Sequence, residues 1–180
     1  MFMSMKKLSS VLILAAMMGQ CSLALAYDRE QLHEDVEAAI RLMKQTDPTL
    51  DKFFKSSEGY AVFPNVGKGA IGIGGAHGKG EVYEKGILIG RASLSQLTIG
   101  FQLGGQVYSE IIFFETKDTL QDFKEGAYKV SAQASAVAAA DGVGANAKYE
   151  HGVAIFTLAK NGLMFEASVG GQKFKFIPLE

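Results

Sequence analysis

The segment most similar to a known chemical motif is a run of glycines. Residues 67–72 match the pattern G-x-G-x-x-G and follow an apolar stretch, as in dinucleotide-binding folds. In those folds the glycines open a helix whose N-terminus faces the pyrophosphate, but residues 73–78 contain three more glycines and are a poor helix-forming sequence. The phosphate-binding lysine motif is also incomplete, because Gly80 stands where a Ser or Thr should follow Lys79. We therefore expect no nucleotide and no other cofactor.

The histidines and serines give no stronger indication of a metal site or of a catalytic site. The three histidines are far apart in the chain, and the nearest pair of metal-ligating types is His33 with Glu37, one helical turn apart. A zinc site usually needs three or four ligands, so we expect no metal site and surface histidines. No serine lies in a G-x-S-x-G elbow or at a spacing that pairs it with a histidine. The sequence therefore predicts no catalytic residues and a function that is not enzymatic.

The first 26 residues have the pattern of a secretory signal. Lys6 and Lys7 precede an apolar stretch from residue 8 to residue 19, which is shorter than the roughly 20 residues that span a bilayer. Ala24 and Ala26 then form a small-x-small cleavage site before a charged segment. We predict cleavage after Ala26, a mature single domain of residues 27–180, and export to the periplasm or outer envelope.

Cys21 is the only cysteine and raises the alternative of a lipoprotein signal. Gln20 fits poorly beside an acylated cysteine, so we favour cleavage after Ala26. Cys21 would then leave with the signal, and the mature chain could form no disulfide and no thiolate metal site. Loss of the two signal lysines would change the formal charge from −1 to −3, which does not suit a nucleic-acid partner.

A helical beginning is predicted for the mature chain. Residues 28–45 have apolar side chains at helical spacing, with acids in the first half and bases in the second. Pro48 should end this helix, and residues 49–56 form a second short helical segment. The apolar positions of the first helix are Leu32, Val36, Ala39, Ile40 and Met43. Core packing is favoured over a peripheral membrane helix, because the polar faces of membrane helices are usually basic.

The composition then changes to that of a glycine-rich sheet. Residues 59–105 contain 13 of the 21 glycines, mixed with β-branched and aromatic residues. The clearest half-buried strand is 96–103, and 106–114 continues beyond Gly104 and Gly105, which should form a bulge or a close backbone approach. Shorter strands are expected at 60–63, 70–73, 81–83 and 87–89.

The last third of the chain adds a further helix and more strands. Residues 116–125 predict a helix that Gly126 ends, while residues 131–140 fit either a helix or a closely packed strand. Strands at 154–160 and 163–169 should form a hairpin through Asn161 and Gly162. A final strand at 173–177 follows Gly170 and Gly171. The predicted fold class is α+β, with an N-terminal amphipathic helix, a mostly antiparallel sheet and one or two further helices. The glycines expected to be structural are Gly104, Gly105, Gly162, Gly170 and Gly171.

Four segments together resemble the successive signatures of the SYLF domain: residues 60–80, 101–110, 131–144 and 158–171. The order and spacing are similar over roughly residues 30–177. The resemblance implies a membrane-binding module, because eukaryotic members bind phosphoinositides and membranes, and some bind actin filaments. Those members carry SH3 or FYVE modules, whereas this chain is expected to carry only the domain and an export signal. Actin is therefore not an expected partner in an envelope compartment.

Binding of phospholipid or a membrane surface is the predicted function. The acidic start of the mature chain, residues 28–37, differs from the basic N-terminal segment of eukaryotic relatives. We therefore assign headgroup binding to cations in or near the glycine-rich loops, where exposed backbone N–H groups could help to bind anions. These candidate lipid-binding residues are Lys68, Lys79, Lys85 and Arg91. The alternative is a structural or assembly protein whose sheet edge binds another envelope protein.

Overall fold

The structure is a computed structural model, which describes residues 28–71, 73–99, 106–126, 135–138, 140, 142–160, 167–168 and 171–179. The predictions for Gly104, Gly105, Gly162 and Gly170 lie outside these residues. Gly171 lies within them and has a φ of +78°, in the left-handed region that favours glycine.

The N-terminal helix forms as the apolar spacing predicts. Residues 28–46 are helical, and Val36, Ala39 and Met43 are buried. The predicted second helical segment consists of a 3₁₀ turn, η1 (Pro48–Leu50), and α2 (Asp51–Ser56). The side chain of Asp47 caps η1 by accepting a hydrogen bond from the backbone N–H of Thr49. Core packing of the first helix is thus confirmed.

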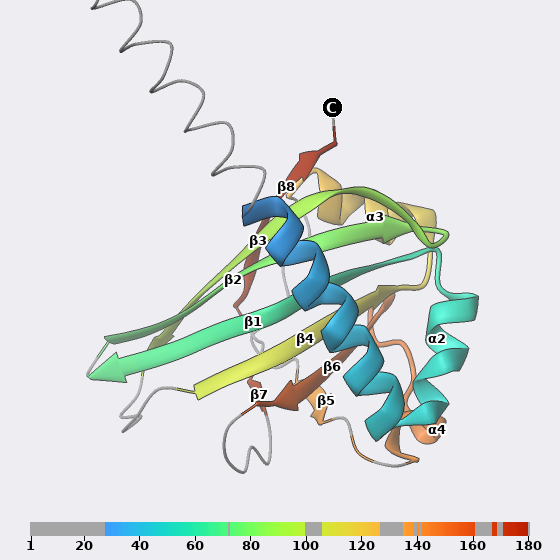
Figure 1. Cartoon of the computed structure of the whole chain (residues 1–180), viewed down its shortest axis with the longest axis horizontal. Helices are drawn as coiled ribbons and strands as arrows, with labels where there is room; N and C mark the ends of the chain where they lie inside the picture. The colour runs from blue at the N-terminus through green and yellow to red at the C-terminus, as the bar shows by residue number, and fades with distance from the viewer. Residues whose placement is uncertain are drawn as a thin grey trace, which may run out of the picture.

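Eight strands form one sheet, in the order β7-β5-β6-β4-β1-β2-β3-β8 (Figure 1). Neighbouring strands are antiparallel except β5 and β6, which are parallel. Two short helices complete the fold, α3 (Lys117–Lys124) and α4 (Val143–Asn146). The predicted α+β class is therefore confirmed. The strands are β1 (Gly59–Ile71), β2 (Ile73–Glu84), β3 (Ile87–Ile99), β4 (Gln106–Phe114), β5 (Ser135–Ala138), β6 (Val153–Ala159), β7 (Ala167–Ser168) and β8 (Lys173–Pro178).

The glycine-rich region differs from the expected set of short strands and loops. It forms three long strands, β1, β2 and β3, because several glycines lie where another backbone comes close. At Gly80 an added Cβ would overlap the carbonyl oxygen of Val62, and at Gly90 it would lie 2.6 Å from the carbonyl oxygen of Ile177. These glycines permit strand packing and do not mark turns.

The structure decides one open prediction for the last third and overturns another. Of the segment 131–140, residues 135–138 form a strand, β5. The expected hairpin between 154–160 and 163–169 is wrong for the described residues, since β7 pairs with β5 and β6 lies between β4 and β5. The tertiary position of β5 beside β6 overrides the local turn signal.

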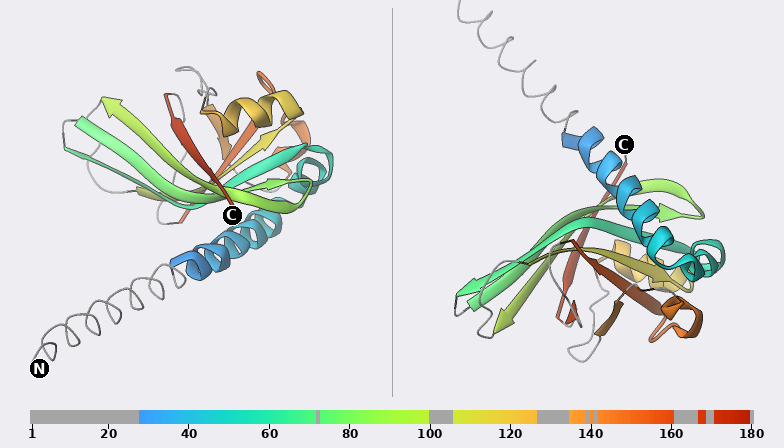
Figure 2. Two further views of the ribbon diagram at one scale, coloured as in Figure 1. Left: turned by 90° about the horizontal axis from the view of Figure 1, so that it is seen from above. Right: turned by 60° about the horizontal axis from the view of Figure 1, so that its bottom comes forward.

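Each face of the sheet contributes to a hydrophobic core. The N-terminal helix, η1 and α2 pack on one face, which we call the outer face, against residues of β1, β2, β4 and β6 (Figure 2). On the opposite, inner face, α3 contributes Leu120 and Phe123 and β8 contributes Phe174. Thr116 caps α3 and Gly126 follows it with a φ of +71°, which confirms the predicted helix. Along each strand, successive side chains point to opposite faces, so a residue's place in the strand decides which of the two faces it lies on.

Candidate functional site

The four predicted headgroup-binding cations lie in strands and a turn. Lys68 is in β1, although its side chain lies outside the described part; Lys79 is in β2, and Arg91 is in β3. Lys85 lies in the turn between β2 and β3, with a φ of +50°. The expectation of glycine-rich loops with free backbone N–H groups is therefore wrong at Lys68 and Lys79, whose residues pair in the β1–β2 ladder.

Two of these lysines already contact acids. Lys79 Nζ lies 3.0 Å from Asp28 Oδ2, at the start of the described helix. Lys85 Nζ lies 2.8 Å from Glu58 Oε2, and the Lys117 side chain also approaches Glu58, at 3.9 Å. The structure thus pairs Lys79 and Lys85 with acids at two separate places, which compensates part of the predicted positive charge.

The strand register creates a different basic surface. Lys79 on β2 pairs with Ser93 on β3, and Ser93 pairs with Lys175 on β8. His77, Ser95 and Lys173 form the next such row. Residues that face each other across antiparallel strands project from the same face. All four basic residues of these rows are exposed.

We call these four residues, together with Arg91, the cationic surface: His77, Lys79, Arg91, Lys173 and Lys175. It lies on the outer face, because Lys79 reaches Asp28 of the N-terminal helix. Within the described residues, no carboxylate lies within ion-pair distance of Lys173 or Lys175. These two lysines were not among the residues predicted from the sequence, although their alternation with Phe174 and Phe176 is typical of an amphipathic edge strand.

The cationic surface has an apolar border. On β8 and just after it, Ile177 is 55% exposed and Leu179 is 40% exposed. Ile177 pairs with Arg91 on β3, and alternation places it on the same face as Lys173 and Lys175. The C-terminal strand therefore presents two lysines followed by two apolar side chains to solvent.

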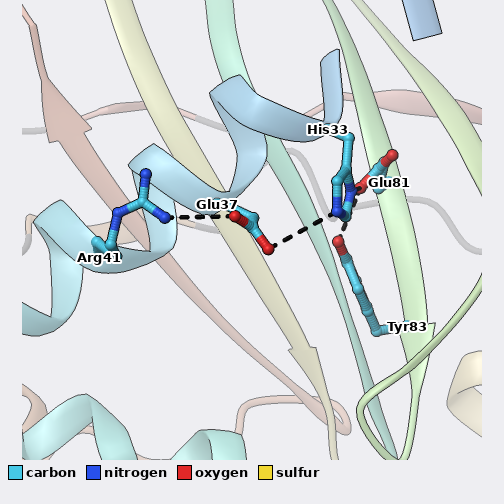
Figure 3. Close-up of polar contacts among 5 residues, drawn as sticks. All are labelled: His33, Glu37, Arg41, Glu81 and Tyr83. Atoms are coloured by element: carbon cyan, nitrogen blue, oxygen red, sulfur yellow. Dashed lines mark hydrogen bonds and ion pairs between the residues drawn. The ribbon is translucent and has the colours of Figure 1, made fainter. Parts of the chain in front are cut away.

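A buried carboxylate holds the N-terminal helix to β2 (Figure 3). Glu81 is 1% exposed, and its Oε2 accepts hydrogen bonds from the Tyr83 hydroxyl, at 2.7 Å, and from His33 Nδ1, at 2.9 Å. Glu37 lies 3.7 Å from His33 Nε2 and 3.3 Å from Arg41. The hydrogen bond to Glu81 raises the pKa of His33. The interpretation of His33 as a plain surface histidine is incomplete, because Glu81 lies 48 residues away in the chain.

The contact between His33 and Glu81 should be detectable as a raised pKa of the His33 imidazole. Because the folded pKa of His33 is raised, its stabilising contact is fully present below the unfolded value of about 6.5 and is lost as pH rises through the folded value. Glu81→Gln should lower the His33 pKa toward 6.5, as measured by NMR titration of the imidazole. Glu37→Gln should lower it less, since Glu37 is the more distant partner. An equal effect of the two substitutions would contradict the assignment.

The described residues contain no group of three or more His, Cys, Asp or Glu side chains that could hold a metal ion. No helix in the described part of the chain is long and apolar enough to cross a membrane. A small open groove of about 280 Å³ lies between the start of the N-terminal helix and strands β1 and β2. Asp28, Asp35, His77 and Lys79 are among its lining residues, so it adjoins the cationic surface.

The fold is that of an α+β domain. The charge of the cationic surface suits anionic partners. Residues 95–176 match the Ysc84 family model, described as Las17-binding protein actin regulator. Over residues 95–176 the chain is thus similar to the Ysc84 family, also called SYLF, in agreement with the resemblance derived from the sequence. This family is known for binding and not for catalysis.

The chain is also similar to beta cell expansion factor A of Aeromonas veronii. The two are 28% identical over 147 residues, which is 76% of this chain and 52% of the relative. The chain thus spans about half the length of that protein. Together the two comparisons support a lipid-binding or actin-regulator-like domain.

Proposed function

We propose that this domain binds the surface of anionic membranes in the cell envelope through the cationic surface. The observation that carries the proposal is the register of β2, β3 and β8, which places Lys79 and Lys175 in one row and His77 and Lys173 in the next. Similarity to the family supports lipid binding in general. The particular surface is our inference.

The distribution of charge favours β8 as the main contact with the membrane surface. Lys79 is compensated by Asp28, whereas Lys173 and Lys175 have no acidic partner among the described residues. A lysine near an anionic leaflet contributes about 1 kcal/mol of binding free energy. The two lysines of β8 therefore contribute more than Lys79, one of the four cations predicted from the sequence.

The exposed apolar residues would add a second contribution. Ile177 lies on the same face as the two lysines, and the exposed Leu179 follows the end of β8. Burial of apolar side chains at the boundary of headgroups and acyl chains strengthens electrostatic attachment. We propose that β8 lies flat on the membrane, with its lysines at the headgroups and its C-terminal end in the interface.

Vesicle binding tests this arrangement. Lys173→Gln with Lys175→Gln should weaken binding to anionic vesicles roughly 30-fold, the equivalent of about 2 kcal/mol, as measured by co-sedimentation at low salt. The matched control is Lys55→Gln with Lys148→Gln, two exposed lysines near α2 and α4, which should retain most of the binding. Wild-type binding should also weaken at high salt.

Three outcomes would contradict the proposal. Co-sedimentation no better than that of an unrelated protein would exclude membrane binding. An equal loss in the two double variants would show that net charge matters and the surface does not. A larger loss for Lys68→Gln with Lys79→Gln than for the β8 pair would favour the residues chosen from the sequence.

Export stays a prediction from the N-terminal sequence. Mass spectrometry of the protein from an envelope fraction should find Tyr27 as its first residue, because Ala24 and Ala26 form the cleavage site. A diacylated N-terminal Cys21 would instead establish the lipoprotein alternative. Full-length protein in the cytoplasmic fraction would contradict both.

Assembly through a sheet edge, the alternative function, has less support. β8 is an edge strand of the described sheet, but Lys173 and Lys175 are exposed on it. Charged residues on an edge strand oppose pairing with another chain. We therefore place the partner of β8 on its face and not along its edge.

A further inference from the structure

The inner face of the sheet contains polar side chains that neither the fold nor the proposed membrane contact uses. Glu110 on β4 is completely buried, and Gln172, just before β8, is also completely buried. Gln172 Nε2 donates a hydrogen bond of 2.9 Å to Glu110 Oε2. Tyr108 and Thr157, each 1% exposed, lie on the neighbouring positions.

Strand alternation and register place these groups together. Tyr108 and Glu110 are two residues apart on β4 and therefore on the same face. Thr157 on β6 is the direct partner of Glu110, so their Cβ atoms are about 5 Å apart. Burial raises the pKa of the Tyr108 phenol, and the nearby Glu110 charge adds to this effect.

One oxygen of each residue makes no hydrogen bond in the described structure. These atoms are Tyr108 Oη, Glu110 Oε1, Thr157 Oγ1 and Gln172 Oε1. Buried polar atoms without a partner are rare in native proteins and require an explanation, of which a bound water or ion is one. Here four such atoms belong to one cluster, and the contact between two of its side chains is established by a hydrogen bond.

The chemistry of this cluster favours a small cation. All four free atoms are oxygens, the ligand type that hard cations prefer. The cluster contains one carboxyl group, and among the described residues no Lys, Arg or His forms an ion pair with it. A single carboxylate among neutral oxygens balances one positive charge, which fits an alkali metal ion better than a divalent ion. Burial raises the pKa of Glu110 to about 7, consistent with a carboxylate that lacks a cationic partner.

We propose that Glu110, Gln172, Tyr108 and Thr157 form an interior site for Na⁺ or K⁺. The ion would take its protein ligands from the four free oxygens and stabilise the packing of β4 and β6 against the segment before β8. The site is independent of the membrane contact, because it lies on the opposite face of the sheet.

The test measures thermal stability of the purified protein at pH 8 in 150 mM choline chloride, NaCl or KCl. At equal ionic strength these salts screen surface charge equally, so a difference in Tm reports specific binding. We expect Tm to rise by roughly 5 °C or more in one of the alkali salts relative to choline. Glu110→Gln, which preserves side-chain shape, should fold and show the same Tm in all three salts.

Two more variants keep the test decisive if Glu110→Gln does not fold. Thr157→Val removes one ligand and should raise the alkali concentration for half of the Tm shift about tenfold. Ser57→Ala removes a buried hydroxyl that also lacks a hydrogen bond but lies outside the cluster, and it should leave the salt response unchanged. Equal Tm of the wild type in all three salts would show that the cluster holds water only. A salt response that persists in Glu110→Gln or is unaffected by Thr157→Val would also overturn the site.

Discussion

Substitution of Gly80 by valine should lower the free energy of unfolding by at least about 3 kcal/mol, enough to unfold many domains of this size. Gly80 lies in β2, where an added Cβ would overlap the carbonyl oxygen of Val62 and lie 2.7 Å from Phe63 Cδ1. Both neighbours belong to the central strand β1, which cannot move away without breaking its ladders to β2 and β4. Urea denaturation followed by circular dichroism measures the effect.

Gly67 provides the matched control. It also lies within a long strand, β1, but an ideal Cβ at this position meets no atom within 4 Å. Gly67→Val should therefore change stability by no more than about 0.5 kcal/mol, because valine suits a strand and has space there. Similar destabilisation by both substitutions would show that loss of glycine itself, and not the close approach at Gly80, is responsible.

Truncation of Phe113 to alanine should cost about 4 kcal/mol of stability, in the range measured for buried phenylalanines. Phe113 is completely buried in β4 and joins the strands to α2. Its ring centroid lies 5.4 Å from that of Phe53, 4.8 Å from that of Phe54 and 5.9 Å from that of Phe156. The alanine would leave a cavity where these rings meet.

Phe54→Ala is the appropriate comparison for this second prediction. Phe54 contacts Phe113 but is only partly buried, so its truncation should destabilise the protein by less than half as much. Both variants can be measured by thermal and urea unfolding. Equal losses for Phe54→Ala and Phe113→Ala would contradict the central position that we assign to Phe113.

Local patterns in the sequence were sufficient for the N-terminal helix, for α3 and for the fold class, although not for α4. The apolar spacing of residues 28–45 predicted a packed helix, since a helix with one apolar stripe must bury it. Gly126 predicted the C-terminal end of α3 because caps act within a few residues. The segment 173–177 after Gly170 and Gly171 was predicted as the last strand, and β8 (Lys173–Pro178) matches it. In each case the physical cause lies within one turn or one strand of the chain.

Strand neighbours could not be derived in the same way. The Asn161-Gly162 pair favours a hairpin, but the neighbours of β6 are β4 and β5, and residues 108–114 and 137–138 that pair with it are distant in sequence. Glycines were interpreted as loops because a sequence does not show which backbone approaches them. Pairing between distant segments depends on the packing and hydrogen bonding of the whole sheet. The conformational preference of one short turn is weak compared with these interactions.

The candidate sites also depend partly on local sequence and partly on tertiary structure. The sequence by itself determined the family resemblance, the likeness to lipid-binding domains and the supply of basic residues. Only the tertiary structure decided that Lys79 is compensated by Asp28, that Lys173 and Lys175 share its face, and that His33 meets the buried Glu81. It likewise placed Glu110 in the interior, although the same residue type on an exposed strand would be solvated. Charge and hydrogen bonding depend on distance and burial in three dimensions, and those follow from strand register, which no short stretch of this sequence contains.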